Sequence, residues 1–387
     1  MKKIVILGST GSIGSSLIDI IKKNKEEFKI LLLTANKNYK KLIKQANFFK
    51  VKHIIIIDKN SFLNCQKILK YKDINVYNDF KSLNKILKNK EIDYTMSSIS
   101  GFEGLIPTLD IIKFTKVIAI ANKESIICGW NLIKNNLNKF KTKFIPVDSE
   151  HFSIWSLTNN VDCKNLEKIY ITASGGPFRK YPLKKFKGIT PAQALNHPNW
   201  TMGKKISIDS ATMMNKVFEI IEAKKIFNLS YKKLKIIIHP KSYLHAIVKF
   251  DNGLTKLLVH DTSMTIPIFN SIYPEYNKKI KSKDLDIEVL NNLNLETIDI
   301  DRFPAIKVIK TLVERDSLFE TVIVSANDKL VNKFLNGKIN FVDISKLLLK
   351  TVNLNEFKKF KNIKPKNAEQ ISKLADYVSL KINNMSV

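Results

Sequence analysis

Arginine is scarce in this chain of 387 residues, although the chain is strongly basic. Arg179, Arg302 and Arg315 are the only arginines among 65 basic residues, which leaves 62 lysines. Proteins that read base edges and phosphates favour arginine, because its planar guanidinium binds these groups bidentately. The lysines are also spread among many asparagines and isoleucines, as AT-biased codon usage produces. We therefore expect no nucleic-acid partner, although the net charge of +30 should draw anionic substrates towards the protein.

Cysteines and long apolar runs are also lacking. Cys65, Cys128 and Cys163 are odd in number and form no CxxC pair, which argues against a disulfide framework and against a zinc site. No apolar run reaches the roughly 18–20 residues that span a bilayer. The opening apolar run ends at Gly8, as a strand entering a turn does and a signal peptide does not. These absences predict a cytoplasmic protein without a membrane partner.

The first part of the chain alternates short apolar runs with segments of helical apolar spacing. The runs that read as strands are KIVILG, FKILLLTA, HIIIID, YTMSSIS, KVIAIA and KFIPVD. Alternation of this kind is typical of an α/β fold with a Rossmann-like, doubly wound parallel sheet. We assign this domain to residues 1–149.

The pattern changes after this domain. Residues 150–284 read as an α+β catalytic domain with the strand candidates IYITASG, KISIDS, KIIIHP, HAIVKF and TKLLVH. A polar loop at about 178–204 lies between the first two, and loops longer than ~12–15 residues are often active-site lids. Residues 285–311 read as a linker, and residues 312–387 as a C-terminal helical domain.

A glycine-rich turn follows the first strand. Gly8, Gly11 and Gly14 lie between KIVIL and the helical segment SSLIDIIKK. Glycines allow a tight turn and close approach to a pyrophosphate, which then faces a helix N-terminus. The spacing is GxxGxxG instead of the usual GxGxxG, so a plain strand-to-helix turn is the alternative. The position at the start of the sheet favours a dinucleotide site.

The end of the second strand indicates which dinucleotide binds. NAD sites usually carry an acidic residue there to bond the ribose hydroxyls. Here FKILLLTA is followed by Asn36, Lys37 and Asn38, with no acid. A lysine at this position suits the extra 2′-phosphate, so the sequence favours NADPH over NADH.

Three carboxylates predict a metal site. Asp148 and Glu150 follow the sixth strand candidate and, in an extended segment, would point to the same side. Glu219 lies further along, on a predicted helix. Three oxygen donors without cysteine suit Mg²⁺ or Mn²⁺ better than Zn²⁺. The alternative is that the three are solvated acids.

Residues near Glu219 could bind a phosphate. Asn215 and Glu219 are four residues apart and would share a helix face, and Lys216 adds a positive charge. Ser210 is predicted to lie at a helix start, where hydroxyl and N–H groups bind anions, or to act only as a cap. Ser174 offers a second hydroxyl beside two glycines, unless the segment is merely a turn.

His197 and Trp200 lie on the long loop. The indole could cover a substrate and exclude water, or it could anchor the loop to the core. His151, next to Glu150, could be a site residue or a structural neighbour of the acids.

Seven motifs together resemble one enzyme family. In chain order they are GSTGSIG, ANKES, VDSEH, SGGPFR, HPNWTMG, KISIDSATMMNK and IHPKS. They resemble the 1-deoxy-D-xylulose 5-phosphate reductoisomerase family. The resemblance covers residues 1 to about 270 and recurs around FPAIK and SANDKLVNKFL. It implies a homodimeric enzyme that rearranges this sugar phosphate by retro-aldol cleavage and re-addition. NADPH then reduces the resulting aldehyde to 2-C-methyl-D-erythritol 4-phosphate.

The resemblance also implies roles for individual residues. It places Mn²⁺ or Mg²⁺, and possibly Co²⁺, on Asp148, Glu150 and Glu219. It implies NADPH contacts from Thr10, Gly11, Ser12, Ile13, Lys37, Asn38, Asn122, Glu124 and Gly203. Substrate contacts are implied for Lys123, Ser149, Glu150, Ser174, His197, Trp200, Ser210, Asn215, Lys216 and Glu219. The catalytic residues implied are Lys123, Asp148, Glu150, His197 and Glu219, and Trp200, Met202 and Met264 would close over the substrate.

Two departures from the family pattern accompany these matches. Asn36 stands where the family usually has glycine, and HDTSMTIP replaces G-x-PDMRxP around Met264.

Two other classes of protein remain as alternatives. One is a different NADP enzyme acting on a phosphorylated carbonyl compound without a metal, and the other is a basic protein that binds nucleic acid.

Overall fold

The computed structural model describes residues 1–159, 161–275 and 277–385, and the chain forms two compact units. The first unit comprises Met1–Ser125, Leu132–Asp148 and Met264–Lys281. The second comprises Ile126–Asn131, Ser149–Ser263 and the chain from Ser282 on. Among the described residues, no helix is both long enough and apolar enough to cross a membrane.

A parallel sheet of seven strands forms the centre of the first unit. Its order is β4-β3-β2-β1-β5-β6-β7, and every pair of neighbours is parallel. The strands are β1 (Lys2–Leu7), β2 (Phe28–Ala35), β3 (His53–Ile56), β4 (Asn75–Tyr77), β5 (Ile92–Ser97), β6 (Thr115–Ile120) and β7 (Lys143–Pro146). The predicted doubly wound sheet is confirmed. Only β4 was missed, because its three residues carry no apolar run.

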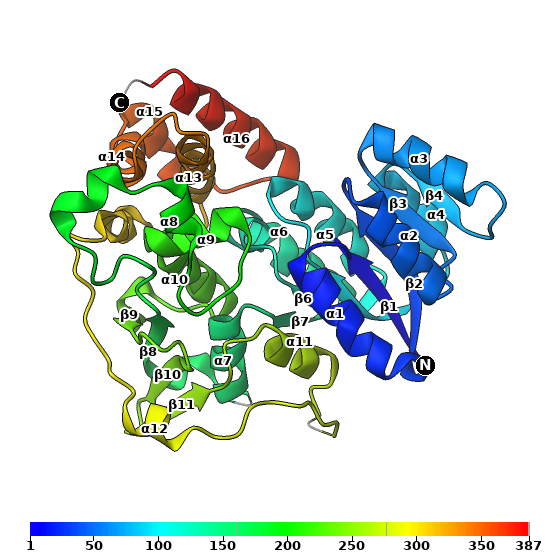
Figure 1. Cartoon of the computed structure of the whole chain (residues 1–387), viewed down its shortest axis with the longest axis horizontal. Helices are drawn as coiled ribbons and strands as arrows, with labels where there is room; N and C mark the ends of the chain where they lie inside the picture. The colour runs from blue at the N-terminus through cyan, green and yellow to red at the C-terminus, as the bar shows by residue number, and fades with distance from the viewer. Residues whose placement is uncertain (160, 276, 386–387) are drawn as a thin grey trace. The chain divides into compact units, whose positions relative to one another are not determined.

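Helices cover both faces of this sheet, which is why its strands are nearly continuous apolar runs. They are α1 (Ser12–Lys23), α2 (Tyr39–Phe48), α3 (Lys59–Leu69), α4 (Leu83–Leu87), α5 (Leu105–Ile112) and α6 (Lys123–Phe140). The later helix α11 (Thr265–Ile272) packs beside α1 (Figure 1). Met264, just before α11, packs against the apolar core of this unit.

The second unit contains a sheet of four strands in the order β11-β10-β8-β9. The strands are β8 (Leu166–Ala173), β9 (Leu234–Ile238), β10 (Leu244–Phe250) and β11 (Thr255–Val259), with β8 and β9 parallel and β10 antiparallel to β8 and β11. Helices α7 (Ser149–Leu157) and α10 (Met214–Ile226) pack on it, and Ile154, Ile169 and Ile220 share its core. The unit also contains α8 (Pro191–Leu195), α9 (Lys204–Ala211) and α12 (Ile287–Asn291).

One strand prediction was wrong. The segment KISIDS belongs to helix α9, Lys204–Ala211. Its alternating isoleucines suggested a strand, but its buried residues Ser207, Ile208 and Ala211 follow helical spacing. Ser210 consequently lies at the end of a helix and not at the start, so the argument that it caps a helix N-terminus was also wrong.

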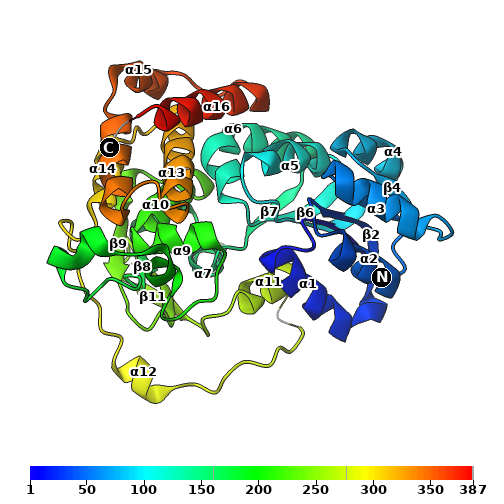
Figure 2. The same ribbon diagram turned by 45° about the horizontal axis from the view of Figure 1, so that its top comes forward.

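The C-terminal region is helical, as predicted. Helices α13 (Phe319–Leu335), α14 (Phe341–Val352) and α16 (Ala368–Asn383) pack together, with the short α15 (Asn355–Lys358) between the last two in the chain (Figure 2). Helix α13 also contacts α9.

The long loop has local structure of its own. It contains a 3-10 segment at Leu183–Gly188 and helix α8, which begins with a capping box between Thr190 and Gln193. The Arg302 guanidinium donates to the carbonyl oxygens of Phe178 and Tyr181 and lies over the Phe186 ring. The first part of the loop is therefore fastened to the rest of the second unit.

Candidate active site

The glycine turn between β1 and α1 has the geometry of a nucleotide-binding turn. Gly8 has φ +84°, and a Cβ added there would lie 2.8 Å from the carbonyl oxygen of Ser98. A Cβ at Gly14 would lie 2.3 Å from the carbonyl oxygen of Gly8. Both positions therefore require glycine. Gly11 precedes the first helical residue, so free N–H groups of α1 lie beside the exposed Gly11 and Ser12.

The end of β2 lies beside this turn. The Thr34 hydroxyl accepts a hydrogen bond from the Gly8 N–H at 2.9 Å. Lys37 is exposed, and the Asn38 side chain caps α2 by accepting from the Lys41 N–H. The Lys41 ammonium donates to the Ser15 hydroxyl at 2.6 Å and to the Thr10 carbonyl oxygen at 3.3 Å. Sequence reasoning missed Lys41, which lies in the first turn of α2 four residues after Lys37 and adds positive charge at the glycine turn.

Asn122 and Glu124 lie at the carboxyl end of β6. Asn122 caps α6 by accepting from the Ser125 N–H, and its amide donates to the Gly101 carbonyl oxygen at 2.9 Å. Glu124 is buried and accepts from the Gly101 N–H at 3.4 Å. Both side chains therefore fix the loop after β5. Gly203, on the second unit, is exposed and precedes α9.

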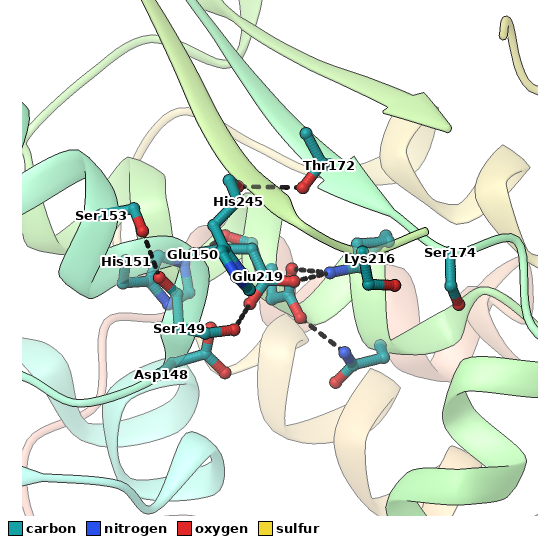
Figure 3. A network of polar contacts seen from close by, with 12 residues as sticks. Asp148, Ser149, Glu150, His151, Ser153, Thr172, Ser174, Lys216, Glu219 and His245 are labelled. Carbon is teal, nitrogen blue, oxygen red and sulfur yellow. Dashed lines mark hydrogen bonds and ion pairs between the residues drawn. The ribbon is translucent and has the colours of Figure 1, made fainter. Parts of the chain in front are cut away.

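The three predicted metal ligands lie together. One carboxylate oxygen from each of Asp148, Glu150 and Glu219 lies within 4.8 Å of the others (Figure 3). The expected extended segment was wrong, because Glu150 is in the first turn of α7 and only Asp148 precedes that helix. The chain turns sharply enough between β7 and α7 to bring both carboxylates to one point. Glu219 reaches it from the middle of α10.

Two lysines neutralise this acidic cluster. The Lys123 ammonium lies 2.5 Å from Asp148 Oδ2. The Lys216 ammonium contacts Glu150 and lies 2.5 Å from Glu219 Oε2, and Figure 3 shows it directed at both glutamates. The side chain of Glu219 is only 1% exposed, so its charge needs a cation close by. Three carboxylates gathered around buried positive charge fit a hard divalent ion, because such an ion would replace the ammonium groups.

His151 has a structural role at this point. Its ring is fully buried, and its Nε2 lies 3.0 Å from the backbone carbonyl oxygen of Glu219. Since a carbonyl oxygen only accepts, the imidazole donates this bond. Of the two roles that the sequence left open for His151, this bond supports the structural one, because it holds the backbone of the helix that carries Glu219.

Ser174, His197 and Gly176 form a second polar cluster. His197 Nδ1 accepts from the N–H groups of Asn199 and Trp200, at 3.2 and 3.0 Å. The proton of the neutral ring is therefore on Nε2, which donates to the Ser174 hydroxyl at 3.0 Å. The Gly176 N–H donates to the same oxygen, also at 3.0 Å. With both lone pairs occupied, the Ser174 O–H remains available to donate to an anion.

His197 should stay neutral in the substrate-free protein. Burial, and then the charge of Lys216, lower the pKa of His197 from 6.5 to about 4. Because the folded pKa is the lower one, the stability that neutral His197 contributes is present above pH 6.5 and is lost as the pH falls towards 4. An NMR titration of the ring should show no protonation of His197 near pH 6.5. A midpoint close to that of a free histidine would contradict the assigned bonds.

The remaining predicted substrate residues lie on neighbouring elements. The Asn215 amide donates to Glu219 Oε1 at 2.5 Å, which confirms that these residues share a helix face. The end of α9 at Ser210 packs against Gly176, where a Cβ would lie 2.9 Å from the Ser210 carbonyl oxygen. The Ser149 hydroxyl donates to Glu150 at 2.6 Å.

The Trp200 ring contacts one of two stacked histidines. It meets the His245 ring edge-on, with centroids 6.2 Å apart. His245 in turn stacks on His260, with centroids 3.6 Å apart. Met202, two residues further along the loop, is half-buried.

Family models match most of the chain. A model described as 1-deoxy-D-xylulose 5-phosphate reductoisomerase matches residues 4–129. Two models of the C-terminal domain of this enzyme match residues 144–227 and 260–379.

Individual relatives match over the full length. A 1-deoxy-D-xylulose 5-phosphate reductoisomerase of Pelagibacter ubique (strain HTCC1062) is 69% identical over 388 residues and covers 100% of both chains. The reductoisomerase of Zymomonas mobilis, solved with NADPH, has 31% identity and a TM-score of 0.88, covering 99% of this chain and 98% of that one. A reductoisomerase solved with NADPH, fosmidomycin and magnesium has 28% identity and a TM-score of 0.90 over the same shares.

Proposed function

The chain belongs to the 1-deoxy-D-xylulose 5-phosphate reductoisomerase family, and from this premise we propose which of its residues carry the reaction. It is an NADP-dependent oxidoreductase that converts 1-deoxy-D-xylulose 5-phosphate to 2-C-methyl-D-erythritol 4-phosphate in isoprenoid biosynthesis, with NADPH and a divalent metal. The observation that carries the residue assignment is the convergence of Asp148, Glu150 and Glu219 beside Lys216.

Asp148, Glu150 and Glu219 hold Mg²⁺ or Mn²⁺ in this proposal. An ion bound there would supply Lewis-acid chemistry, which polarises a ketone and stabilises alkoxide charge. With an ion on the carboxylates, Lys123 would donate to a substrate oxygen and Lys216 would bind the phosphate.

The phosphate is recognised by hydroxyl, amide and ammonium groups together. Ser174 donates its O–H. His197 and Gly176 both donate to the Ser174 oxygen, so the O–H points away from these two donors. Ser210, Asn215 and Lys216 supply further donors from α9 and α10. This binding energy is remote from the reacting carbons and can hold them in place during the rearrangement. Trp200 and Met202 cover the substrate and keep water from the reactive intermediate.

Thr10, Gly11, Ser12 and Ile13 would hold NADPH, because the N-terminus of α1 beside them favours a pyrophosphate. Asn122 and Glu124, in the same unit, would add further contacts. Lys37 and Asn38 bind the 2′-phosphate, because no acidic residue follows β2 and Lys37 is exposed there.

Replacing Lys37 with alanine should weaken NADPH binding more than NADH binding. The lost ammonium–phosphate contact involves only the 2′-phosphate, so we expect the Kd for NADPH to rise about tenfold, as loss of a charge-assisted hydrogen bond does, with little change for NADH. Lys40→Ala, an exposed lysine on the same segment, is the matched control. Titration of cofactor fluorescence measures both constants. Equal losses for the two cofactors would remove the 2′-phosphate assignment.

The assignment as a whole is tested by following NADPH oxidation with 1-deoxy-D-xylulose 5-phosphate, first with Mn²⁺ and then with EDTA. We expect oxidation that EDTA abolishes and Mn²⁺ restores. Oxidation that persists in EDTA would overturn the metal role of the three carboxylates.

We also propose that the enzyme is a cytoplasmic homodimer. Strand β11 lies at an edge of the second sheet. Leu254, just before this strand, is 58% exposed, and Leu257, within it, is 46% exposed. An edge strand with exposed apolar side chains favours pairing with another chain. Light scattering after size exclusion should give twice the chain mass of 44.4 kDa, and Leu257→Lys should shift the protein towards the monomer.

A further inference from the structure

We propose that Asn327, on α13, positions the substrate phosphate site by holding Asp209, the residue before Ser210. This inference rests on the proposed role of Ser174 and Ser210 in phosphate binding. It assigns part of substrate recognition to the C-terminal helices, none of whose residues has been given a role above.

The contact between Asn327 and Asp209 is buried and specific. The Asn327 amide donates to Asp209 Oδ1 at 2.7 Å, across 118 residues of sequence. Asn327 is 0% exposed and Asp209 is 2% exposed. A carboxylate so far from water depends on such donors, and losing one costs much more than it would at the surface.

The next residue on α13 strengthens the same connection. The Lys205 ammonium lies 2.8 Å from Asp328 of α13. It also lies 3.8 Å from Asp209, which is one turn after Lys205 on α9. Two consecutive residues of α13 therefore bind α9, one through Asp209 and one through Lys205. Together they fix both the rotation of α9 and its position along α13.

The position of α9 sets the position of the proposed phosphate donors. Ser210 follows Asp209 directly, and its backbone packs against Gly176 so closely that a Cβ there would lie 2.9 Å from the Ser210 carbonyl oxygen and 3.2 Å from the Ala211 Cα. The Gly176 N–H in turn donates to the Ser174 hydroxyl. Contacts thus run without a break from Asn327 through Asp209 and Ser210 to Ser174, so a shift of α9 would move both hydroxyls.

Asn327→Ala should therefore act on substrate binding. We expect the KM for 1-deoxy-D-xylulose 5-phosphate to rise about tenfold, the order expected when a hydrogen bond to a charged group is lost. The kcat should fall much less, and the KM for NADPH should not change. Steady-state kinetics with saturating Mn²⁺ measures all three.

Exchanging the two side chains tests the bond itself. Asp209→Asn combined with Asn327→Asp restores an amide-to-carboxylate hydrogen bond in the opposite direction, and the carboxylate stays near Lys205, which already pairs with Asp328. Each single variant should raise the KM, and the double variant should return it most of the way to the wild-type value. A double variant that regains stability but keeps the raised KM would overturn the positioning role, even if Asn327→Ala fails to fold.

Ser325→Ala is the matched control. Ser325 lies on the same helix and is 2% exposed, but it donates to the Ala375 carbonyl oxygen on α16 at 2.6 Å. It should lower stability without changing the KM for the substrate, and an equal rise in KM would show that any loosening of α13 has this effect.

Ser210→Ala separates this inference from the proposed function. An unchanged KM in Ser210→Ala would mean that the phosphate site itself is misassigned. A raised KM in Ser210→Ala with an unchanged KM in Asn327→Ala would overturn only the role of Asn327.

Discussion

Glu219→Gln is expected to lower turnover at limiting Mn²⁺ by at least about 100-fold. Loss of a residue that only supports a metal ligand costs up to about 100-fold, and loss of a ligand itself should cost at least as much. The amide keeps the shape of the side chain but removes a charge from a cluster in which three carboxylate oxygens lie within 4.8 Å. High Mn²⁺ should recover part of the activity, because the other two carboxylates remain. NADPH binding should be intact, since the glycine turn belongs to a different unit of the chain.

Glu222→Gln provides the control for this result. Glu222 is on the same helix, is 1% exposed and is not part of the cluster. This variant can lose stability, but its dependence on Mn²⁺ should match that of the wild type. If Glu219→Gln also shows the wild-type dependence on Mn²⁺, Glu219 is not a metal ligand.

Lys216→Met should destabilise the metal-free protein by roughly 3–5 kcal/mol, the cost of removing one partner of a buried ion pair. Methionine has nearly the shape of lysine, so the main loss is the charge facing Glu150 and Glu219, whose side chains are 14% and 1% exposed. Urea unfolding in EDTA measures this loss. Mn²⁺ should then stabilise the variant more than it stabilises the wild type, because the ion no longer competes with the ammonium group.

The comparison with Lys224→Met makes this prediction specific. Lys224 lies on the same helix, and its ammonium binds the carbonyl oxygen of Glu314 away from the cluster. The response of this variant to Mn²⁺ should equal that of the wild type. If Mn²⁺ stabilises Lys216→Met only as much as it stabilises the wild type, the Lys216 ammonium does not occupy the place of a metal ion.

Local patterns in the sequence were sufficient to predict the parallel sheet of the first unit. Buried strands of a parallel sheet are short apolar runs, and six of the seven could be recognised because both faces are covered by helices. The glycine turn was recognisable because Gly8 and Gly14 have no room for a Cβ. The spacing of Asn215 and Glu219 on one helix face was also visible, since a helix repeats every 3.6 residues.

Local patterns failed where a long-range contact decides the structure. KISIDS alternates like a strand, yet it is helical, and its polar Asp209 is buried against Asn327 of α13. Asp148 and Glu150 converge through a turn into α7 and not through an extended segment. The hydrogen bonds of Ser174 to His197, and of Lys41 to the glycine turn, leave no local pattern, because the bonded residues lie 23 and 26 positions apart in the sequence.

The sequence by itself determined the fold class, because short apolar runs and the helical segments between them are local patterns. It also identified the glycine turn as a candidate for binding a dinucleotide and the three acids as candidates for binding a metal ion, because their residue types suit those ligands. Only the tertiary structure decided that Lys123 and Lys216 neutralise those acids, that His151 is structural and that α13 holds α9. These facts depend on which side chains share a buried space, and burial makes an unpaired charge or donor costly enough to select one arrangement.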